Sequence, residues 1–168
     1  MIRDPRARGR ALAALYETVE ARLFADLGEA GVLPPVDDDA DASRVRREWA
    51  CFALYACVRG LIAAGGFNRE TGDAVEALHE AALESWRERE PGDEAERRRL
   101  LSERYAEYGA IGQAGGASAA ATVGRRLGEA AAAHMVAKGI APEGLAEMAG
   151  ALHESLAEGA AEAVRRAE

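Results

Sequence analysis

Residues 49–58 read WACFALYACV, a stretch that is apolar on nearly every side of the helix it would form. A helix that is hydrophobic all round is buried at the centre of a protein, whereas a surface helix keeps one polar face. The stretch therefore predicts a central helix over about residues 43–64, which Gly65 and Gly66 end. A buried helix needs other elements around it, so we expect this helix to organise the fold.

Apolar stripes on both sides of this stretch predict further helices. Residues that recur every three or four positions mark the inner face of a helix, and no alternating run of β-branched residues predicts a strand. The stripes span residues 12–27, 75–86, 100–111, 123–134 and 145–156. We therefore expect an all-α protein, an irregular bundle of five to six helices that forms a single domain over residues 1–168.

Capping residues and glycines give the expected helix ends. Asp73 and Glu76 have the spacing of a capping box for the third helix, and Asp93 opens the fourth in the same way. The glycines between residues 109 and 116 are expected to end the fourth helix, because glycine disfavours helical backbone. Ser118 can then cap the fifth helix.

Residues 32–42, VLPPVDDDADA, have the composition of a linker. The two prolines disfavour helix and the four aspartates keep the segment in water. The linker separates the first helix, whose stripe includes Leu12, Tyr16 and Leu23, from the rest of the chain. That helix can fold back in cis and complete the bundle, or it can pack in trans on a second copy.

Alanine dominates the composition. Forty of the 168 residues are alanine and nine are aromatic. Alanine favours helix but buries little surface, so the helices have to pack closely through small residues. Gly124 and Gly128, four positions apart, can let two helix backbones approach each other. With so few large side chains to fill one core, we also expect the chain to self-associate as a homodimer.

Charge and cysteine usage restrict the partners and the compartment. The formal net charge of −8 argues against nucleic acid, which binds basic surfaces, and leaves a protein partner possible. Cys51 and Cys57 lie roughly 9 Å apart along the central helix, too far for a disulfide. Two buried free thiols fit the cytoplasm. Arg59 in the middle of the most apolar stretch argues against a membrane span, and early charged residues argue against a leader peptide.

The acidic linker has a spacing that resembles an EF-hand calcium loop. Such a loop places carboxylates at its first, third, fifth and twelfth positions, which are here Asp37, Asp39, Asp41 and Glu48. However, Ala42 stands where the turn needs glycine, and Arg44 stands where the loop needs an apolar residue. We therefore expect a solvated acidic segment in which Asp41 or Ser43 caps the central helix, and no bound metal.

Two histidines are candidates for chemistry. Glu76 and His79 form half of the motif of di-iron bundles, in which two such pairs face each other, but the sequence has no second pair. His134 is the one histidine expected on an apolar face, where a hydrogen-bonded structural role is the usual one. No catalytic residue or cofactor is expected. The sequence favours a non-enzymatic helical interaction or regulatory module; the alternative is a small metal- or ligand-binding enzyme with its site inside the bundle.

Overall fold

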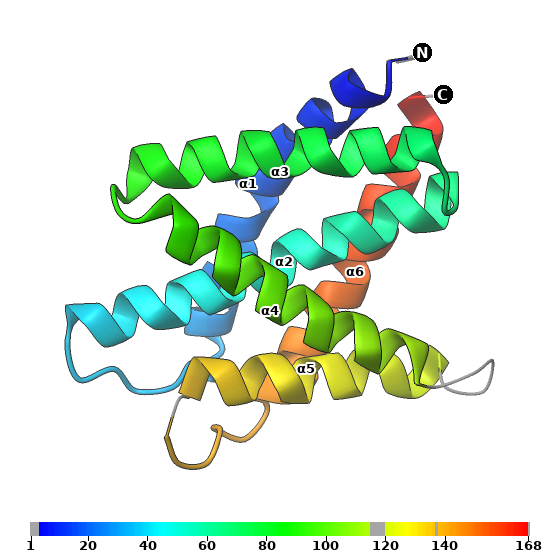
Figure 1. The fold of residues 1–168 in the computed structure, drawn as a ribbon. Coiled ribbons are helices and arrows are strands. Elements are labelled where there is room, and N and C mark those ends of the chain that lie inside the picture. Colours follow the sequence, from blue (N-terminus) through cyan, green and yellow to red (C-terminus); the bar gives the residue numbers. More distant parts are fainter. Residues whose placement is uncertain (1–3, 115–119, 137, 168) are drawn as a thin grey trace.

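The computed structural model describes residues 4–114, 120–136 and 138–167, and these form six helices and no strand (Figure 1). The helices are α1 Pro5–Glu29, α2 Asp39–Gly65, α3 Arg69–Arg89, α4 Glu94–Gln113, α5 Ala120–Val136 and α6 Leu145–Ala167. The expectation of an all-α bundle is therefore confirmed.

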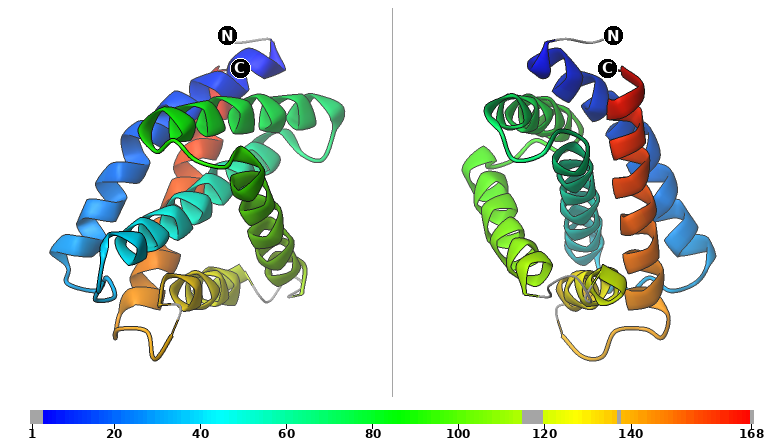
Figure 2. Two further views of the ribbon diagram at one scale, coloured as in Figure 1. Left: turned by 60° about the vertical axis from the view of Figure 1, so that its left-hand side comes forward. Right: turned by 90° about the vertical axis from the view of Figure 1, so that its right-hand side faces the viewer.

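Helix α2 is the centre of the molecule. It packs against each of the other five helices, and nine of the ten residues 49–58 are buried. Figure 2 shows α2 between α4 on one side and α6 on the other. By length and composition α2 could also cross a membrane, but 67% of its apolar window is buried inside the protein. The core helix of a soluble protein has these same properties.

The linker before α2 is shorter than expected. Helix α2 begins at Asp39, not near Ser43, because Asp38 caps it: the Asp41 backbone N–H donates to the Asp38 carboxylate at 2.8 Å. Carboxylates in the first turn also interact favourably with the helix dipole. The second half of the acidic segment is therefore helical, and the predicted linker of residues 32–42 ends too late.

The start of α3 also differs from the prediction. The helix begins at Arg69, since Asn68 caps it by accepting a 2.9 Å hydrogen bond from the Thr71 backbone N–H. Asp73 lies inside the helix and does not cap it. Asparagine is a favourable helix cap, but the capping-box spacing of Asp73 and Glu76 is an equally plausible start in the sequence and led to the wrong boundary.

Helix α4 begins as predicted and ends later. Asp93 caps it and accepts a 2.9 Å hydrogen bond from the Ala95 backbone N–H. The helix continues through Gly109 and Gly112 to Gln113, so the prediction that these two glycines end it is wrong. An isolated glycine lowers helix stability by about 1 kcal/mol but does not end a helix that its neighbours support. Ser118, the expected cap of α5, lies outside the described residues.

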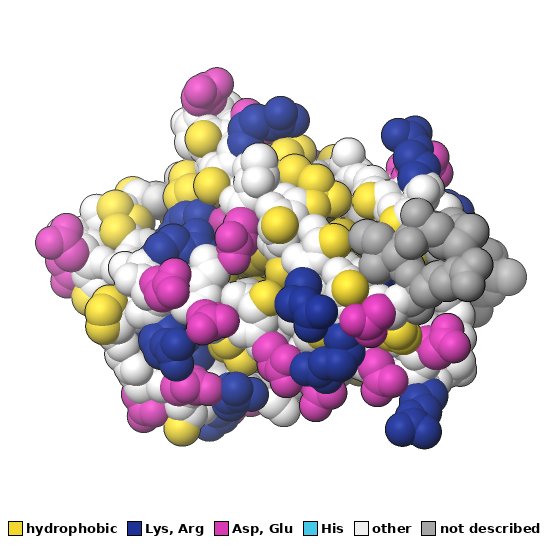
Figure 3. Space-filling model, turned by 90° about the horizontal axis from the view of Figure 1, so that it is seen from above, with side chains coloured by type: hydrophobic (Ala, Val, Ile, Leu, Met, Phe, Trp, Pro, Cys, Tyr) yellow, Lys and Arg dark blue, Asp and Glu magenta, His cyan; other side chains and the backbone are white. Residues whose placement is uncertain are grey.

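Helix α1 packs in cis. Its Leu12, Tyr16 and Leu27 are buried in the core of the same chain, and the Tyr16 hydroxyl donates to the Ala50 carbonyl oxygen of α2 at 2.9 Å. Arg6 adds an ion pair to Glu76 of α3 at 2.8 Å. Seen from above, side chains of both charge signs lie on the surface with apolar side chains between them (Figure 3). The first helix therefore completes the bundle and is not a free arm.

Small residues bring α5 and α6 together. A Cβ atom on Gly128 would overlap the carbonyl oxygen of Ala146, and one on Gly150 would lie 2.5 Å from the Gly124 carbonyl oxygen. These distances leave no room for any side chain where the two helices cross. The prediction that Gly124 and Gly128 allow a close helix contact is confirmed.

Candidate functional site

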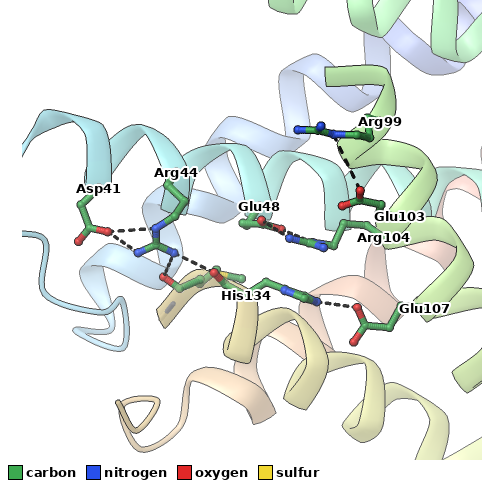
Figure 4. A network of polar contacts seen from close by, with 9 residues as sticks. Asp41, Arg44, Glu48, Arg99, Glu103, Arg104, Glu107 and His134 are labelled. Carbon is green, nitrogen blue, oxygen red and sulfur yellow. Dashed lines mark hydrogen bonds and ion pairs between the residues drawn. The ribbon is translucent and has the colours of Figure 1, made fainter. Parts of the chain in front are cut away.

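Polar side chains join α2, α4 and α5 beside the amino-terminal half of α2 (Figure 4). Arg44 forms an ion pair with Asp41 and donates to the carbonyl oxygens of His134 and Met135, at 2.8 and 2.7 Å. These carbonyls belong to the last turn of α5, where an arginine satisfies unpaired acceptors and interacts favourably with the helix dipole. Asp41 therefore holds an arginine in place.

Glu48 forms the most buried ion pair of this network. Its side chain accepts two hydrogen bonds from Arg104 of α4, at 2.8 and 2.7 Å, and the residue is 6% exposed. This pairing raises the pKa of Arg104. Removing one member of such a pair leaves the other as an uncompensated buried charge. Glu48 thus fixes α4 to α2.

The calcium-loop arrangement does not occur. Asp39, Asp41 and Glu48 all lie on α2, and Asp37 lies on the loop before it. A helix cannot direct these carboxylates at one cation as a loop does. Within residues 4–114, 120–136 and 138–167, no group of three or more His, Cys, Asp or Glu side chains is placed to hold a metal ion.

Glu76 and His79 do not share a site either. Glu76 accepts from Arg6, whereas the Nε2 atom of His79 lies 3.0 Å from the hydroxyl of Tyr105 on α4. Burial lowers the pKa of His79 to about 4, so this ring is neutral at physiological pH. Both residues hold neighbouring helices together.

The prediction for His134 is wrong in its placement. His134 is partly exposed, and its Nε2 atom lies 2.6 Å from a carboxylate oxygen of Glu107. The fully buried histidine is His153 of α6, which stacks on Phe52 with ring centroids 4.1 Å apart. The spacing of four from Ala149 to His153 is the signal that places both residues on the buried face of α6.

His153 is buried without a hydrogen-bond partner among the described residues for either ring nitrogen. Burial lowers its pKa to about 3. Tyr108 also packs on Phe52, with ring centroids 5.3 Å apart, and its hydroxyl is buried without a partner among the described residues. This cluster is therefore an aromatic core that keeps its polar atoms neutral.

Cys51 and Cys57 are buried and form no disulfide, as predicted. Burial raises the pKa of the Cys57 thiol to about 12 and raises that of Cys51 further. Both side chains are therefore protonated thiols at physiological pH. Because the thiolate is the reactive form, neither residue is placed to act as a nucleophile.

A cavity lies between α4 and the pair of α2 and α6. Only three of the 20 residues of α4 are buried, so this helix leaves part of α2 and α6 uncovered. We call the resulting space the α4 groove; its volume is about 890 Å³. Its lining is Tyr55, Arg59, Ile62, Ala63, Phe67, Gly109, Gly112, Gln113, Glu154, Ala157, Glu158, Ala161, Glu162 and Arg165.

Phe67 is a large apolar residue of the α4 groove, yet 91% of its surface is exposed to solvent. A rigid turn presents it: the Gly66 N–H donates to the Ile62 carbonyl at 2.7 Å, and the Asn68 side chain donates to the Gly65 carbonyl at 2.7 Å. Gly66 has a φ of 74°, a conformation that favours glycine. No sequence motif predicted a role for Phe67, which directly follows Gly65 and Gly66.

The α4 groove and the polar network differ in what they offer a partner. The charged groups in Figure 4 already satisfy one another, whereas the groove has an exposed aromatic side chain at its edge and apolar residues of α2 and α6 in its lining. No known protein family, curated protein or solved structure matches this chain.

Proposed function

We propose that the protein is a non-enzymatic helical interaction module that acts as a homodimer, and that two copies pair through the α4 groove. The observation that carries the proposal is Phe67, a large apolar side chain held 91% exposed at the edge of an apolar cavity of the same chain. In a two-fold dimer each copy inserts its Phe67 into the groove of the other.

Two-fold symmetry explains why the anchor and its receptor lie together. In a symmetric dimer the same patch forms both halves of the interface, so each copy must carry an anchor and a matching cavity side by side. Burying one phenylalanine contributes about 1.5–3 kcal/mol, and the symmetric contact contributes it twice. Such a pair of aromatic anchors is the usual source of interface affinity.

The charged residues of the groove support the same occupant. Arg59 pairs with Glu154 at its edge, and Glu158, Glu162 and Arg165 of α6 line it as well. Arginines and glutamates together can form ion pairs with their symmetry-related counterparts, whereas a surface of one sign would repel its own copy. The proposed location is the cytoplasm, where the two free thiols stay reduced.

The test is the dissociation constant of the full chain, measured by sedimentation equilibrium over a range of protein concentrations. Phe67→Ala should weaken pairing at least about a hundredfold, since it removes the anchor from both halves. Ile140→Ala is the matched control, because Ile140 is 95% exposed and does not line the groove. It should leave the dissociation constant unchanged.

A second pair of variants fills the groove instead of removing the anchor. An added Cβ atom at Gly112 meets no atom within 4 Å, so Gly112→Glu should fold normally and place a charge in the groove. Gly72→Glu is the control, at an equally open helical site outside the groove. Dimers that survive both Phe67→Ala and Gly112→Glu, or a wild-type mass that stays at 17.8 kDa at every concentration, would refute the proposal.

A further inference from the structure

A second pocket lies where α1, α2 and α3 meet the start of α4. Its volume is about 370 Å³ and its lining shares no residue with the groove. The lining comprises Glu20, Arg46, Arg47, Ala50, Trp86, Arg89, Glu90 and Arg97. Four arginines against two glutamates leave a formal excess of two positive charges, in a chain whose net charge is −8.

Arg97 is the residue that makes this pocket a candidate binding site. It is only 7% exposed. Of its three guanidinium nitrogens, Nη2 donates to the backbone carbonyl of Glu90, and Nη1 is buried with no hydrogen-bond partner among the described residues. Among the described residues, no carboxylate forms an ion pair with Arg97. A buried charge without a counter-ion is costly, so a site of this kind favours an anion.

The other charged groups of the pocket leave room for an anion. Glu20 is fully buried and already paired with Arg46, whose Nη2 lies 2.7 Å from the carboxylate. Arg47 makes only a long contact of 3.5 Å to Glu90, and Arg89 reaches only the Ser85 carbonyl, at 3.4 Å. Arg47 and Arg89 therefore keep donors available beside Arg97.

The remaining lining is apolar. Ala50 of α2 and the ring of Trp86 of α3 are both 8% exposed. A cavity of this volume is typical of a site for a small molecule, and here two apolar residues lie among charged side chains. Guanidinium groups bind carboxylate and phosphate oxygens through paired hydrogen bonds.

We propose that this pocket binds a small organic anion, whose carboxylate or phosphate group pairs with Arg97 and whose apolar part packs on Trp86 and Ala50. Arg47 and Arg89 supply further hydrogen bonds to the same group. The inference is independent of the dimer, because no residue of the α4 groove takes part.

The experiment uses the full chain and two probes, inorganic phosphate and benzoate, titrated by calorimetry at constant ionic strength with chloride as the reference anion. We expect saturable binding of at least one probe. Binding of phosphate alone assigns the site to phosphoryl groups, and binding of benzoate alone assigns it to carboxylates with an apolar body. Binding of neither probe would overturn the proposal.

Variants locate the binding. Arg97→Met should abolish it while leaving the melting temperature of the ligand-free protein unchanged or higher, because an uncompensated buried charge is removed. Arg98→Met is the matched control, since the neighbouring Arg98 is exposed and paired with Glu94. If Arg97→Met fails to fold, Arg47→Gln and Arg89→Gln should each weaken binding about tenfold, as expected for the loss of a charged hydrogen bond. Unchanged affinity in these variants contradicts the proposal.

Discussion

At the scale of single residues, the structure separates polar side chains that are paired from those that are buried alone. Glu48 and Arg104, or Asp41 and Arg44, satisfy each other at the junction of helices. His153 and Arg97, in contrast, are buried with unpartnered nitrogens. A buried polar group without a partner lowers the free energy of unfolding, so substitutions at these positions should change stability measurably.

The first prediction concerns His153 and pH. Its pKa is about 3 in the folded protein, below its ordinary value of 6.5, so the unfolded chain binds a proton that the folded chain does not. The contribution of His153 to stability is therefore fully present above pH 6.5 and is lost as the pH falls toward about 3. The loss is about 1.4 kcal/mol per pH unit for one proton.

His153→Leu tests this, because leucine keeps the site apolar and does not titrate. The free energy of unfolding, measured by urea denaturation between pH 4.5 and 6.5, should depend on pH less steeply in the variant, by about 1.4 kcal/mol per unit. Above pH 7 the two slopes should agree. Equal slopes across the acid range would mean that His153 is not buried as a neutral ring.

At the scale of helices, close approach replaces the large side chains that the chain lacks. The crossing of α5 and α6 depends on glycines, since a Cβ atom on Gly128 or on Gly150 would overlap the backbone of the other helix. Helix α4 is the opposite case. It has few buried residues and is held by the Glu48–Arg104 pair and by Leu101 and Tyr108, and for this reason it leaves the α4 groove beside it.

Gly128→Ala should destabilise the protein by about 1–3 kcal/mol, because the new methyl group forces α5 and α6 apart. The control is Gly159→Ala on the exposed side of α6, where an added Cβ meets no atom within 4 Å. That change should stabilise the helix by roughly 0.5–1 kcal/mol. Thermal unfolding followed by circular dichroism measures both, and equal effects would show that the helix crossing does not require glycine.

At the scale of the whole molecule, α1 closes the bundle and brings the amino-terminal end of the chain near the carboxyl-terminal end (Figures 1 and 2). Leu23 is 8% exposed within the core of its own chain. If α1 packs in cis, a charge at this position acts on the fold itself and not on an interface between copies.

Leu23→Asp should therefore lower the free energy of unfolding by about 2–5 kcal/mol, the range for losing a buried leucine, without a specific loss of dimer. Ala25→Asp, at an exposed position of the same helix, should change stability by less than about 0.5 kcal/mol. Light scattering at a temperature where both variants are folded reports the mass. A folded Leu23→Asp monomer beside a dimeric Ala25→Asp protein would instead place α1 in the interface.

The amino-acid sequence was sufficient to predict the helical class, the central place of residues 49–58, the free thiols and the close contact through Gly124 and Gly128. These features depend on periodicity and composition over one or two turns, which local physics controls. The start of α2 was harder to predict from the sequence, because Asp38, Asp39 and Asp41 can each cap a helix and neighbouring contacts select among them.

The pairing of polar residues could not be predicted from the sequence, because it depends on tertiary contacts. Glu48 pairs with Arg104, 56 positions away, and His134 with Glu107, 27 positions away, so no local pattern contains these pairs. The same holds for the cis packing of α1, the burial of His153 in place of His134, the lone guanidinium of Arg97 and the groove beside Phe67. Each of these depends on how helices far apart in the sequence cross, and an alanine-rich helix presents similar faces to many neighbours, so its sequence alone leaves the choice of neighbour open.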